Sequence, residues 1–248
     1  MKLSLITVSY NSKLTIRDTL ESVKNQSTRN FEYIVIDGGS TDGTIEILKD
    51  YSNIIHKIVS EPDKGIYDAM NKGIEIATGD IVGILNSDDT FYSNTVINEV
   101  ISFHKKNKVQ ASIGNISQYT KRGKLIRLYC SDSWVNKDLR LGIMPPHPSI
   151  FFEKELFDLY GNYSLNYKIA ADYELIVRYF LKQKIVWKYS NIHTTKMLIG
   201  GASSNGIISY VKITMEIIKL LKHNEVRFFK LNIFCRFIFK LREILLVK

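Results

Sequence analysis

The chain has 248 residues, of which 45% are hydrophobic and 24% are charged. A chain of this length and composition can bury one sizeable core, which excludes intrinsically disordered and fibrous proteins. Its 34 basic and 25 acidic side chains give a formal net charge of +9. That charge leaves nucleic acid, an anionic membrane surface and an anionic substrate such as a nucleotide open as partners.

The positive charge is concentrated near the C-terminus. Residues 219–248 hold eight basic and two acidic side chains, a net charge of +6. The preceding residues hold 26 basic and 23 acidic side chains and are nearly balanced at +3. A nucleic-acid-binding module needs basic residues across its body, so we expect no nucleic acid among the partners of this chain.

Apolar strand-like segments alternate with helix-like segments in the first hundred residues. The periodicity predicts strands and intervening helices over the following ranges: strands 3–9, 31–36, 54–60 and 80–85; helices 14–26, 45–49 and 66–77. Alternation at this spacing predicts a mostly parallel sheet with helices on both faces.

The second half of the sequence is less regular. The patterns predict antiparallel strands over 111–117 and 124–129 and a rigid proline-rich segment over 144–148. They also predict a helix over 154–160, a second helix from 171 and a last strand over 183–189. A helical appendix is expected from about residue 205. We find no repeat and no low-complexity linker. No apolar stretch reaches the roughly 20 residues that span a bilayer.

Polar clusters follow three of the predicted strands. They are Tyr10-Asn11, Asp37-Gly38-Gly39 and Asn86-Ser87-Asp88-Asp89. In open α/β sheets the ligand crevice lies outside the carboxyl ends of the strands. We therefore expect these three sequence-distant clusters to converge on one site.

Each acidic cluster has a functional and an ordinary structural interpretation. Asp88 and Asp89 suit a hard divalent cation that also binds substrate phosphates, but aspartate is also common in turns and at helix N-caps. Asp37 suits a ribose or base edge, with Gly38 and Gly39 allowing close approach of the ligand. It is equally typical of a simple turn.

The segment 61–71 places three acids, a lysine and an asparagine around a helix start. Asp68 and Asn71 are three residues apart, so they share a face of the predicted helix. That face suits a nucleotide crevice with Lys64 towards a phosphate. The alternative is an ordinary helix start, with Asp63 as the N-cap and a solvated polar face.

Two residues of the second half are candidates for proton transfer. Asp172 precedes an apolar helix and fits either an N-cap or a general base for an acceptor hydroxyl. His147 is held stiffly between Pro146 and Pro148. Cys130 and Cys235 form no metal-binding or catalytic motif, so a reduced cytosolic setting is expected.

Six motifs in sequence order resemble the family 2 glycosyltransferases of bacterial surface-polysaccharide assembly. The resemblance covers about residues 1–205 and rests on the segments 5–11, 35–43, 63–73, 85–89, 146–152 and 170–175. It implies the GT-A fold, a Rossmann-like α/β fold with a mostly parallel central sheet. It also implies a nucleotide-sugar donor, with a preference for a UDP-linked one, and Mg²⁺ or Mn²⁺ as the cofactor.

The resemblance also implies roles for individual residues. Asp172 matches the catalytic base, Asp88 and Asp89 the metal-binding acids, and His147 a position near the acceptor. The donor-binding set comprises Tyr10, Asn11, Asp37, Lys64, Gly65, Asp68, Asn71, Asn86 and Asp88. Asn86 stands where the family's metal motif has its first aspartate, which weakens the expectation of strict metal dependence.

These observations predict an inverting transfer of a sugar to a glycan or lipid-linked saccharide acceptor. Residues 1–100 would form the nucleotide-binding half of a catalytic domain, 101–205 its acceptor half, and 206–248 a basic and aromatic tail. A nucleotidyltransferase and a non-catalytic nucleotide- or nucleic-acid-binding protein are the alternatives. Neither a glycine-rich triphosphate loop nor a basic body supports them.

Aromatic and basic side chains interleave in the tail. They are Phe228, Phe229, Phe234, Phe237 and Phe239 with Arg227, Lys230, Arg236 and Lys240. The pattern predicts an imperfect amphipathic helix that attaches the chain to the anionic inner face of the cytoplasmic membrane. The alternative is a helix that packs on the body or forms a homo-oligomer contact.

Overall fold

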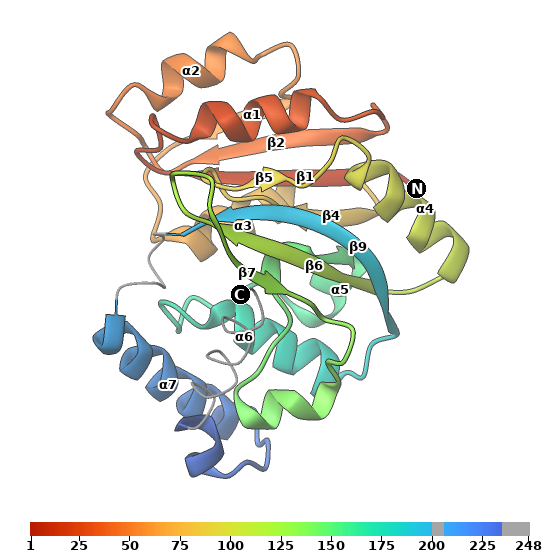
Figure 1. The fold of residues 1–248 in the computed structure, drawn as a ribbon, viewed down its shortest axis with the longest axis vertical. Coiled ribbons are helices and arrows are strands. Elements are labelled where there is room, and N and C mark those ends of the chain that lie inside the picture. Colours follow the sequence, from red (N-terminus) through yellow and green to blue (C-terminus); the bar gives the residue numbers. More distant parts are fainter. Residues whose placement is uncertain (200–205, 235–248) are drawn as a thin grey trace.

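The computed structural model describes residues 1–199 and 206–234 (Figure 1). Its first half alternates strands and helices as the periodicity predicts. The elements are β1 (Leu3–Ser9), α1 (Ile16–Lys24), β2 (Phe31–Asp37), α2 (Thr44–Asp50), β3 (Lys57–Ser60), α3 (Ile66–Ile76) and β4 (Ile81–Ile84). The strand predicted over 54–60 is shorter than expected because residues 51–54 form a turn.

The second half starts with two elements that the sequence analysis did not predict, β5 (Thr90–Phe91) and α4 (Val96–Asn107). The remaining elements include two short 3₁₀ helices, over Asn136–Leu141 and His147–Ser149, and a π-helical turn over Val177–Lys182. They also include β6 (Ala111–Tyr119), β7 (Leu125–Tyr129), β8 (Ile150–Glu153), α5 (Glu155–Tyr160), α6 (Ala171–Ile176), β9 (Trp187–Leu198) and α7 (Gly206–His223). The last strand was predicted over 183–189, and β9 starts four residues later and runs nine residues further.

One mixed sheet joins the two halves. Its strand order is β3-β2-β1-β4-β8-β6-β9-β5, with β7 paired to β6. The strands β3, β2, β1 and β4 are parallel, whereas β8 is antiparallel to β4 and β6, and β7 is antiparallel to β6. The predicted α/β fold is thus confirmed, and every antiparallel pair includes a strand of the second half.

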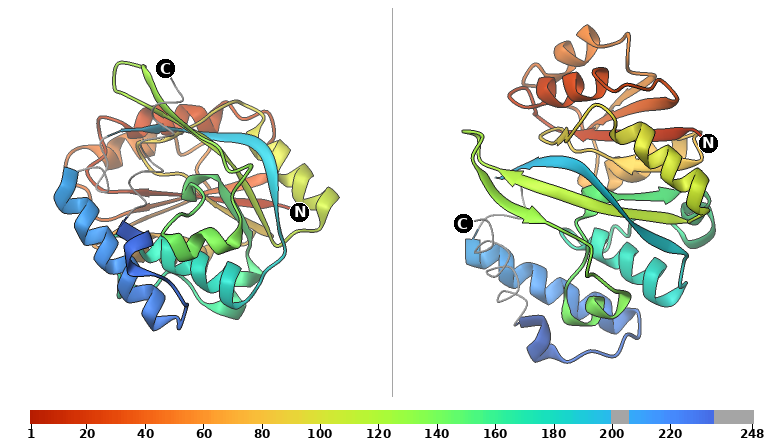
Figure 2. Two further views of the ribbon diagram at one scale, coloured as in Figure 1. Left: turned by 60° about the horizontal axis from the view of Figure 1, so that its bottom comes forward. Right: turned by 45° about the vertical axis from the view of Figure 1, so that its right-hand side comes forward.

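Apolar side chains fill both faces of the sheet. Strand β1 points Leu3 and Leu5 to one face, under α1 and α4, and Ile6 and Val8 to the other, under α3. Burial on both faces explains why β1 and β2 read as continuous apolar runs. Figure 2 shows the helices gathered on the two sides of this sheet.

The C-terminal helix α7 packs on the body. Ile217, Leu220 and Leu221 are buried in the core cluster that also holds α6 side chains. For this helix the structure follows the alternative of a packed element. Residues 235–248, which include Arg236, Phe237, Phe239 and Lys240 of the predicted amphipathic pattern, lie outside the described residues.

Candidate active site

The carboxyl ends of β1, β2 and β4 lie next to one another. Ser9 pairs in register with Asp37, and Ile6 with Ile84. The hydroxyls of Ser12 and Ser87, from the loops that follow β1 and β4, are 2.7 Å apart. The three polar clusters therefore line one edge of the sheet, as expected for strand ends in an α/β fold.

Asp37 at the end of β2 is fully buried. Its Oδ2 accepts hydrogen bonds from the backbone of Gly39 (3.0 Å) and Ser40 (2.8 Å) and from the Ser60 hydroxyl (2.8 Å), and its Oδ1 accepts one from Ser40 Oγ (2.5 Å). The carboxylate thus organises the loop that follows β2. Its contact with a nucleoside stays a prediction.

Tyr10 and Asn11 differ in what they offer to a ligand. Asn11 has a positive φ of 48°, which asparagine tolerates, and its side-chain oxygen accepts a hydrogen bond from Thr41 N at 3.0 Å. It therefore joins the β1 loop to the β2 loop. Tyr10 is 65% exposed and leaves its ring available for a flat ligand.

Asp63 is a crevice residue that the sequence analysis considered only as an N-cap. A Cβ at Gly38 would lie 2.4 Å from Asp63 Oδ2 and 3.3 Å from the Tyr10 ring. A side chain at this position would require the Asp63 carboxylate to move. The two glycines that follow Asp37 indicated a close approach to the backbone, but they did not identify Asp63 as the neighbour.

Three of the donor-site candidates, Lys64, Gly65 and Asp68, form the turn that begins α3. Asp68 Oδ2 accepts a hydrogen bond from Lys64 N at 3.0 Å, and Gly65 has a φ of 115° that favours glycine. No atom lies within 4 Å of a Cβ built at Gly65, so this turn is open. The Lys64 residue is exposed at the same turn.

At the end of β4, Asp88 and Asp89 have different surroundings. Asp89 is buried, and its two oxygens accept hydrogen bonds from Leu198 N (3.3 Å) and Asn86 Nδ2 (3.2 Å). Burial, with the neighbouring Asp88 charge, raises the pKa of Asp89 to about 8. Asp89 thus joins β4 to the end of β9, and its role as a metal ligand stays a prediction.

Asp88 remains the carboxylate suited to a cation. It is half-buried, and burial raises the pKa of its carboxyl group. The buried Asn86 Oδ1 has no hydrogen-bond partner among the described residues. Together they offer two oxygen donors at one strand end, which fits a hard divalent cation that takes its other ligands from phosphates and water. Within 1–199 and 206–234, no three His, Cys, Asp or Glu side chains gather as a metal site.

The candidate base Asp172 lies at the start of α6. Its Oδ1 accepts hydrogen bonds from Tyr173 N at 2.7 Å and from the Tyr67 hydroxyl at 3.2 Å. Tyr67 follows Gly65 by two residues, so this contact brings the starts of α3 and α6 together. Burial raises the pKa of Asp172 to about 6, although the Tyr67 and Tyr173 hydrogen bonds oppose it.

His147 and Asn71 lie behind this contact. The His147 Nε2 is 2.6 Å from the Tyr163 hydroxyl, and burial lowers the pKa of His147 to about 4, so the imidazole is neutral. The Asn71 amide exchanges two 2.9 Å hydrogen bonds with the Tyr163 backbone. Both side chains are engaged with Tyr163, and the acceptor contact of His147 and the donor contact of Asn71 stay predictions.

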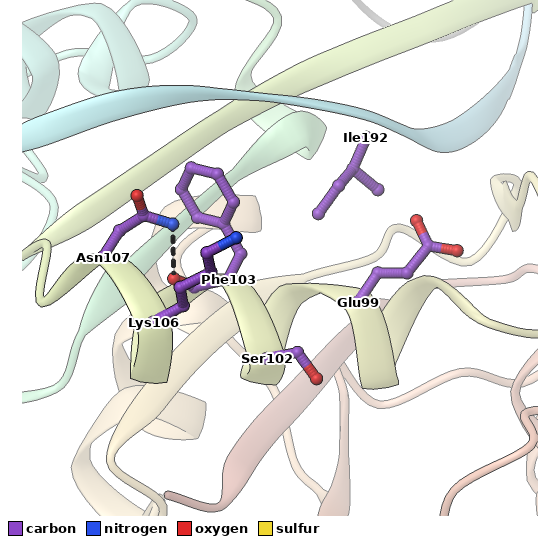
Figure 3. Close-up of a pocket in the computed structure, with 6 residues that line it drawn as sticks. All are labelled: Glu99, Ser102, Phe103, Lys106, Asn107 and Ile192. Atoms are coloured by element: carbon purple, nitrogen blue, oxygen red, sulfur yellow. Dashed lines mark hydrogen bonds between the residues drawn. The ribbon is translucent and has the colours of Figure 1, made fainter.

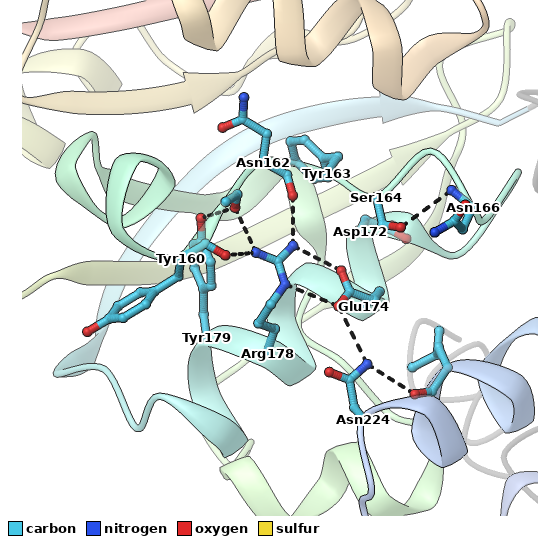
Figure 4. Close-up of polar contacts among 12 residues, drawn as sticks. Tyr160, Asn162, Tyr163, Ser164, Asn166, Asp172, Glu174, Arg178, Tyr179 and Asn224 are labelled. Atoms are coloured by element: carbon cyan, nitrogen blue, oxygen red, sulfur yellow. Dashed lines mark hydrogen bonds and ion pairs between the residues drawn. The ribbon is translucent and has the colours of Figure 1, made fainter.

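An arginine fixes the loop between α5 and α6. Arg178 binds both carboxylate oxygens of Glu174, at 3.1 and 3.0 Å, and donates to the carbonyls of Tyr160, Gly161 (2.7 Å) and Asn162 (2.7 Å) (Figure 4). Such bidentate charge-assisted bonds hold one geometry firmly. They anchor the segment that carries Tyr163 against the helix that carries Asp172.

A shallow pocket lies elsewhere, beside α4 and β9. It measures about 440 Å³ and is lined by Glu99, Ser102, Phe103, Lys106, Asn107 and Ile192 (Figure 3). Helix α4 lies near the amino end of β1, whereas the polar clusters follow the carboxyl ends (Figure 1). The pocket therefore does not belong to the strand-end site.

Three relatives are similar in sequence. A PGL/p-HBAD biosynthesis glycosyltransferase of Mycobacterium bovis is 27% identical over 212 residues, 83% of this chain and 80% of that protein. An uncharacterised glycosyltransferase of Mycobacterium tuberculosis is 33% identical over 71% of this chain and 67% of its own length. The putative teichuronic acid biosynthesis glycosyltransferase TuaG of Bacillus subtilis is 45% identical over 89 residues, 35% of each chain.

Solved structures share the fold. S. aureus TarS 1-349, in complex with UDP-GlcNAc, has a TM-score of 0.69 at 20% identity, over 89% of this chain and 66% of that one. A mannosyltransferase of Pyrobaculum calidifontis, in complex with GDP-Man and Mn²⁺, has a TM-score of 0.68 at 15% identity, over 90% of this chain. The chain spans about two thirds of the length of these solved chains, 66% and 64%.

A family profile matches most of the catalytic body. Residues 4–159 match the family described as Glycosyl transferase family 2. This range starts in β1 and ends in α5, so it contains the three strand-end clusters that the sequence motifs identified. The chain belongs to glycosyl transferase family 2, and it is a glycosyltransferase.

Proposed function

We propose that the chain transfers a sugar from a nucleoside diphosphate sugar to a hydroxyl acceptor with inversion at the anomeric carbon. The observation that carries the proposal is the placement of two carboxylates, Asp88 just after β4 and Asp172 at the start of α6 in contact with Tyr67; burial raises the pKa of both. Groups of this kind are typical of catalytic sites, because burial without full compensation keeps them reactive.

In the proposed reaction Asp172 acts as the general base. Its carboxylate accepts the proton of the acceptor hydroxyl while that oxygen attacks the anomeric carbon. The bond from the anomeric carbon to the diphosphate oxygen breaks, and the nucleoside diphosphate leaves with the bonding electron pair. A pKa of about 6 leaves Asp172 mostly ionised at neutral pH and makes it a stronger base than an ordinary aspartate.

The donor is held at the strand ends in this proposal. Asp88 and Asn86 Oδ1 would hold Mg²⁺ or Mn²⁺, which neutralises charge on the diphosphate. The exposed Tyr10 ring offers a stacking surface for the base, and Lys64 a positive charge for a phosphate. The complexes of similar folds with UDP-GlcNAc and with GDP-Man and Mn²⁺ support this donor class.

The acceptor class follows from the relatives. Two of them are named for PGL/p-HBAD biosynthesis and for teichuronic acid biosynthesis. We therefore propose a glycan or lipid-linked saccharide acceptor, and a UDP-sugar as the donor. Assembly of such an acceptor at the inner face of the cytoplasmic membrane would place the enzyme there.

A donor screen tests the proposal. Purified full-length chain with Mn²⁺ is incubated with a panel of UDP- and GDP-sugars, and release of the nucleoside diphosphate is measured. We expect one UDP-sugar to turn over fastest, and UDP to bind more tightly than UTP or single-stranded nucleic acid in calorimetry. Preference for the triphosphate would favour a nucleotidyltransferase, and preference for nucleic acid a binding module.

We also propose that the C-terminal region attaches the chain to anionic lipid. No helix in the described ranges is long and apolar enough to cross a membrane. After α7, however, Phe229 is 78% and Leu231 72% exposed, beside the exposed basic residues Arg227 and Lys230. Exposed apolar side chains among cations are typical of a surface that rests on anionic lipid.

Flotation with vesicles tests the attachment. Full-length chain is compared with a variant that carries Phe229→Ser and Leu231→Ser, on vesicles of anionic and of neutral lipid. We expect the unaltered chain to float with anionic vesicles only and the variant to float less. The matched control is Lys105→Ser with Lys106→Ser on α4, far from this surface. Equal flotation of all three proteins would refute the attachment through this surface, and a shift to dimers on sizing columns would favour an oligomer contact.

A further inference from the structure

One carboxylate of α7 reaches the segment that leads into the candidate base. Glu216 Oε1 accepts a hydrogen bond from Lys168 N at 3.1 Å, and its Oε2 accepts two more, from Ile169 N and Ala170 N, both at 2.9 Å. Three consecutive amides therefore converge on one side chain that lies 46 to 48 residues later in the sequence. Hydrogen bonds to a charged acceptor are about twice as strong as neutral ones.

These amides belong to the entrance of α6. Ala170 is the N-cap of this helix, and its side chain cannot accept a hydrogen bond. Glu216 therefore provides from another helix the negative acceptor that a capping side chain usually supplies. Asp172 is the second residue of α6 and follows Ala170 by two residues. The bonds to Glu216 therefore fix the backbone immediately before Asp172.

The same segment is held from its other side by α3. The Tyr67 hydroxyl donates to Ile169 O at 2.5 Å and also lies 3.2 Å from Asp172 Oδ1. Ile169 thus has its N–H bound by α7 and its carbonyl bound by α3. The peptide that precedes the candidate base is clamped between two helices that are far apart in the sequence.

Helix α7 is a firm support for such a contact. Ile217, Leu220 and Leu221 bury one side of the helix, and Lys182 Nζ donates to Asn224 O at 2.9 Å just beyond its end. Glu216 lies next to Ile217, so the packed side of the helix fixes the position of the Glu216 backbone. A group held by packing on a rigid element positions its partner more accurately than a group on a loop.

We propose that Glu216 is a positioning residue for Asp172, which it sets in place through the peptide 168–170. The proposal rests on the proposed function, in which Asp172 is the base. Glu216 lies outside residues 4–159, the range that matches the family profile. It makes α7 part of the catalytic unit, although the sequence pattern favoured a separate appendix from residue 206.

The proposal predicts a defect in turnover without a defect in nucleotide binding. Glu216→Ala removes the acceptor of three amides, so we expect kcat to fall by about 10- to 100-fold, the effect of displacing a reacting group by about 1 Å. The dissociation constant of UDP should stay within about twofold. Glu216→Gln keeps one acceptor oxygen and should recover part of the lost turnover.

Amide exchange gives a readout that does not depend on activity. Hydrogen–deuterium exchange of a peptide that covers 163–175 should be faster in Glu216→Ala than in the unaltered chain, because three amides lose their acceptor. Met215→Ala, at an exposed neighbour on the same helix, is the matched control and should change neither exchange nor kcat. Turnover is measured as UDP or GDP release from the donor that reacts fastest in the screen.

The outcomes separate this inference from the proposed function. Unchanged exchange at 163–175 in Glu216→Ala overturns the contact, and faster exchange with unchanged kcat overturns its role in positioning. If Glu216→Ala unfolds, Glu216→Gln decides by the same two measurements. Asp172→Asn is measured in parallel: full activity there refutes the base itself, whereas an inactive Asp172→Asn beside a fully active Glu216→Ala refutes only the positioning.

Discussion

The buried carboxylates of β2 differ from those at the end of β4 and the start of α6. Glu32 in β2 accepts hydrogen bonds from the Ser4 hydroxyl, from Thr78 N (2.5 Å) and Oγ1 (2.7 Å), and from Gly79 N (3.1 Å). Burial alone would raise the pKa of Glu32, but these bonds and the charge of Lys2 outweigh it and lower the pKa to about 2. Asp37, at the end of the same strand, is likewise surrounded by donors.

Asp88 and Asp172 are partly buried and have fewer donors. Burial raises the pKa of both, to about 6 for Asp172. A carboxylate that its surroundings fully satisfy stabilises the fold, whereas one that lacks donors retains its capacity to bind a cation or take a proton. The comparison indicates a structural role for Glu32 and supports the proposed chemical roles of Asp88 and Asp172, and each can be tested separately. The nucleoside contact of Asp37 stays a prediction.

The largest effect is expected for Asp172→Asn. The amide keeps the shape of the side chain but cannot accept the proton, so turnover should fall by about 10²- to 10⁴-fold. Binding of UDP, measured by calorimetry, should stay nearly unchanged because the donor lies at the strand ends. Asp158→Asn, at an exposed site on α5, is the control and should keep full turnover. An Asp172→Asn variant with normal kcat would show that the Asp172 carboxylate has no chemical role.

Glu32→Ala should act on stability instead. It leaves the Ser4 hydroxyl and the amides of Thr78 and Gly79 without their acceptor, so the free energy of unfolding should fall by about 2–4 kcal/mol at pH 7. The lowered pKa means that Glu32 stabilises the fold above its ordinary pKa of 4.5, and that this contribution is lost as the pH falls towards about 2.

Urea unfolding from pH 7 to pH 3 measures this difference. The gap between the unaltered chain and Glu32→Ala should narrow below about pH 4.5. Glu75→Ala, at an exposed position on α3, should unfold like the unaltered chain at every pH. A gap that stays constant across this range would mean that the hydrogen bonds of Glu32 do not depend on its charge.

A smaller effect is expected for Asp88→Ala. Loss of the open carboxylate at the end of β4 should weaken UDP binding in the presence of Mn²⁺ by about tenfold or more, with little change in its absence. Calorimetry with and without the ion measures both values. Asp18→Ala, at an exposed position on α1, is the control. Equal weakening with and without Mn²⁺ would assign Asp88 to direct contact with the nucleotide.

Much of the fold follows from local patterns, and the exceptions have physical causes. Helix α4 was missed although Val96, Val100 and His104 recur at helical spacing on its buried side. The end of β9 was missed because Ser190, Asn191 and other polar residues interrupt its apolar pattern. Ser190 donates to Ile113 O of β6, and Asn191 accepts from Tyr189 of its own strand, and a local apolar pattern reveals neither partner.

The site residues likewise divide into those that the sequence could bring together and those that it could not. Asp37 and Asp88 could be brought together from the sequence because the carboxyl ends of parallel strands share one edge of the sheet. The contacts of Asp172 could not, since Tyr67 is 105 residues earlier and Glu216 joins the preceding peptide from α7. Likewise, nothing local in the Pro146-His147-Pro148 segment indicates that the imidazole faces Tyr163.

The pH dependence of turnover tests the role of Asp172 most directly. The base must be ionised, and burial raises its pKa to about 6, so kcat for the fastest donor should fall about tenfold per pH unit below pH 6 and be level above it. The residual activity of Asp172→Asn should lack this break. A level profile of the unaltered chain between pH 5 and pH 7, or the same break in both proteins, would contradict Asp172 as the base.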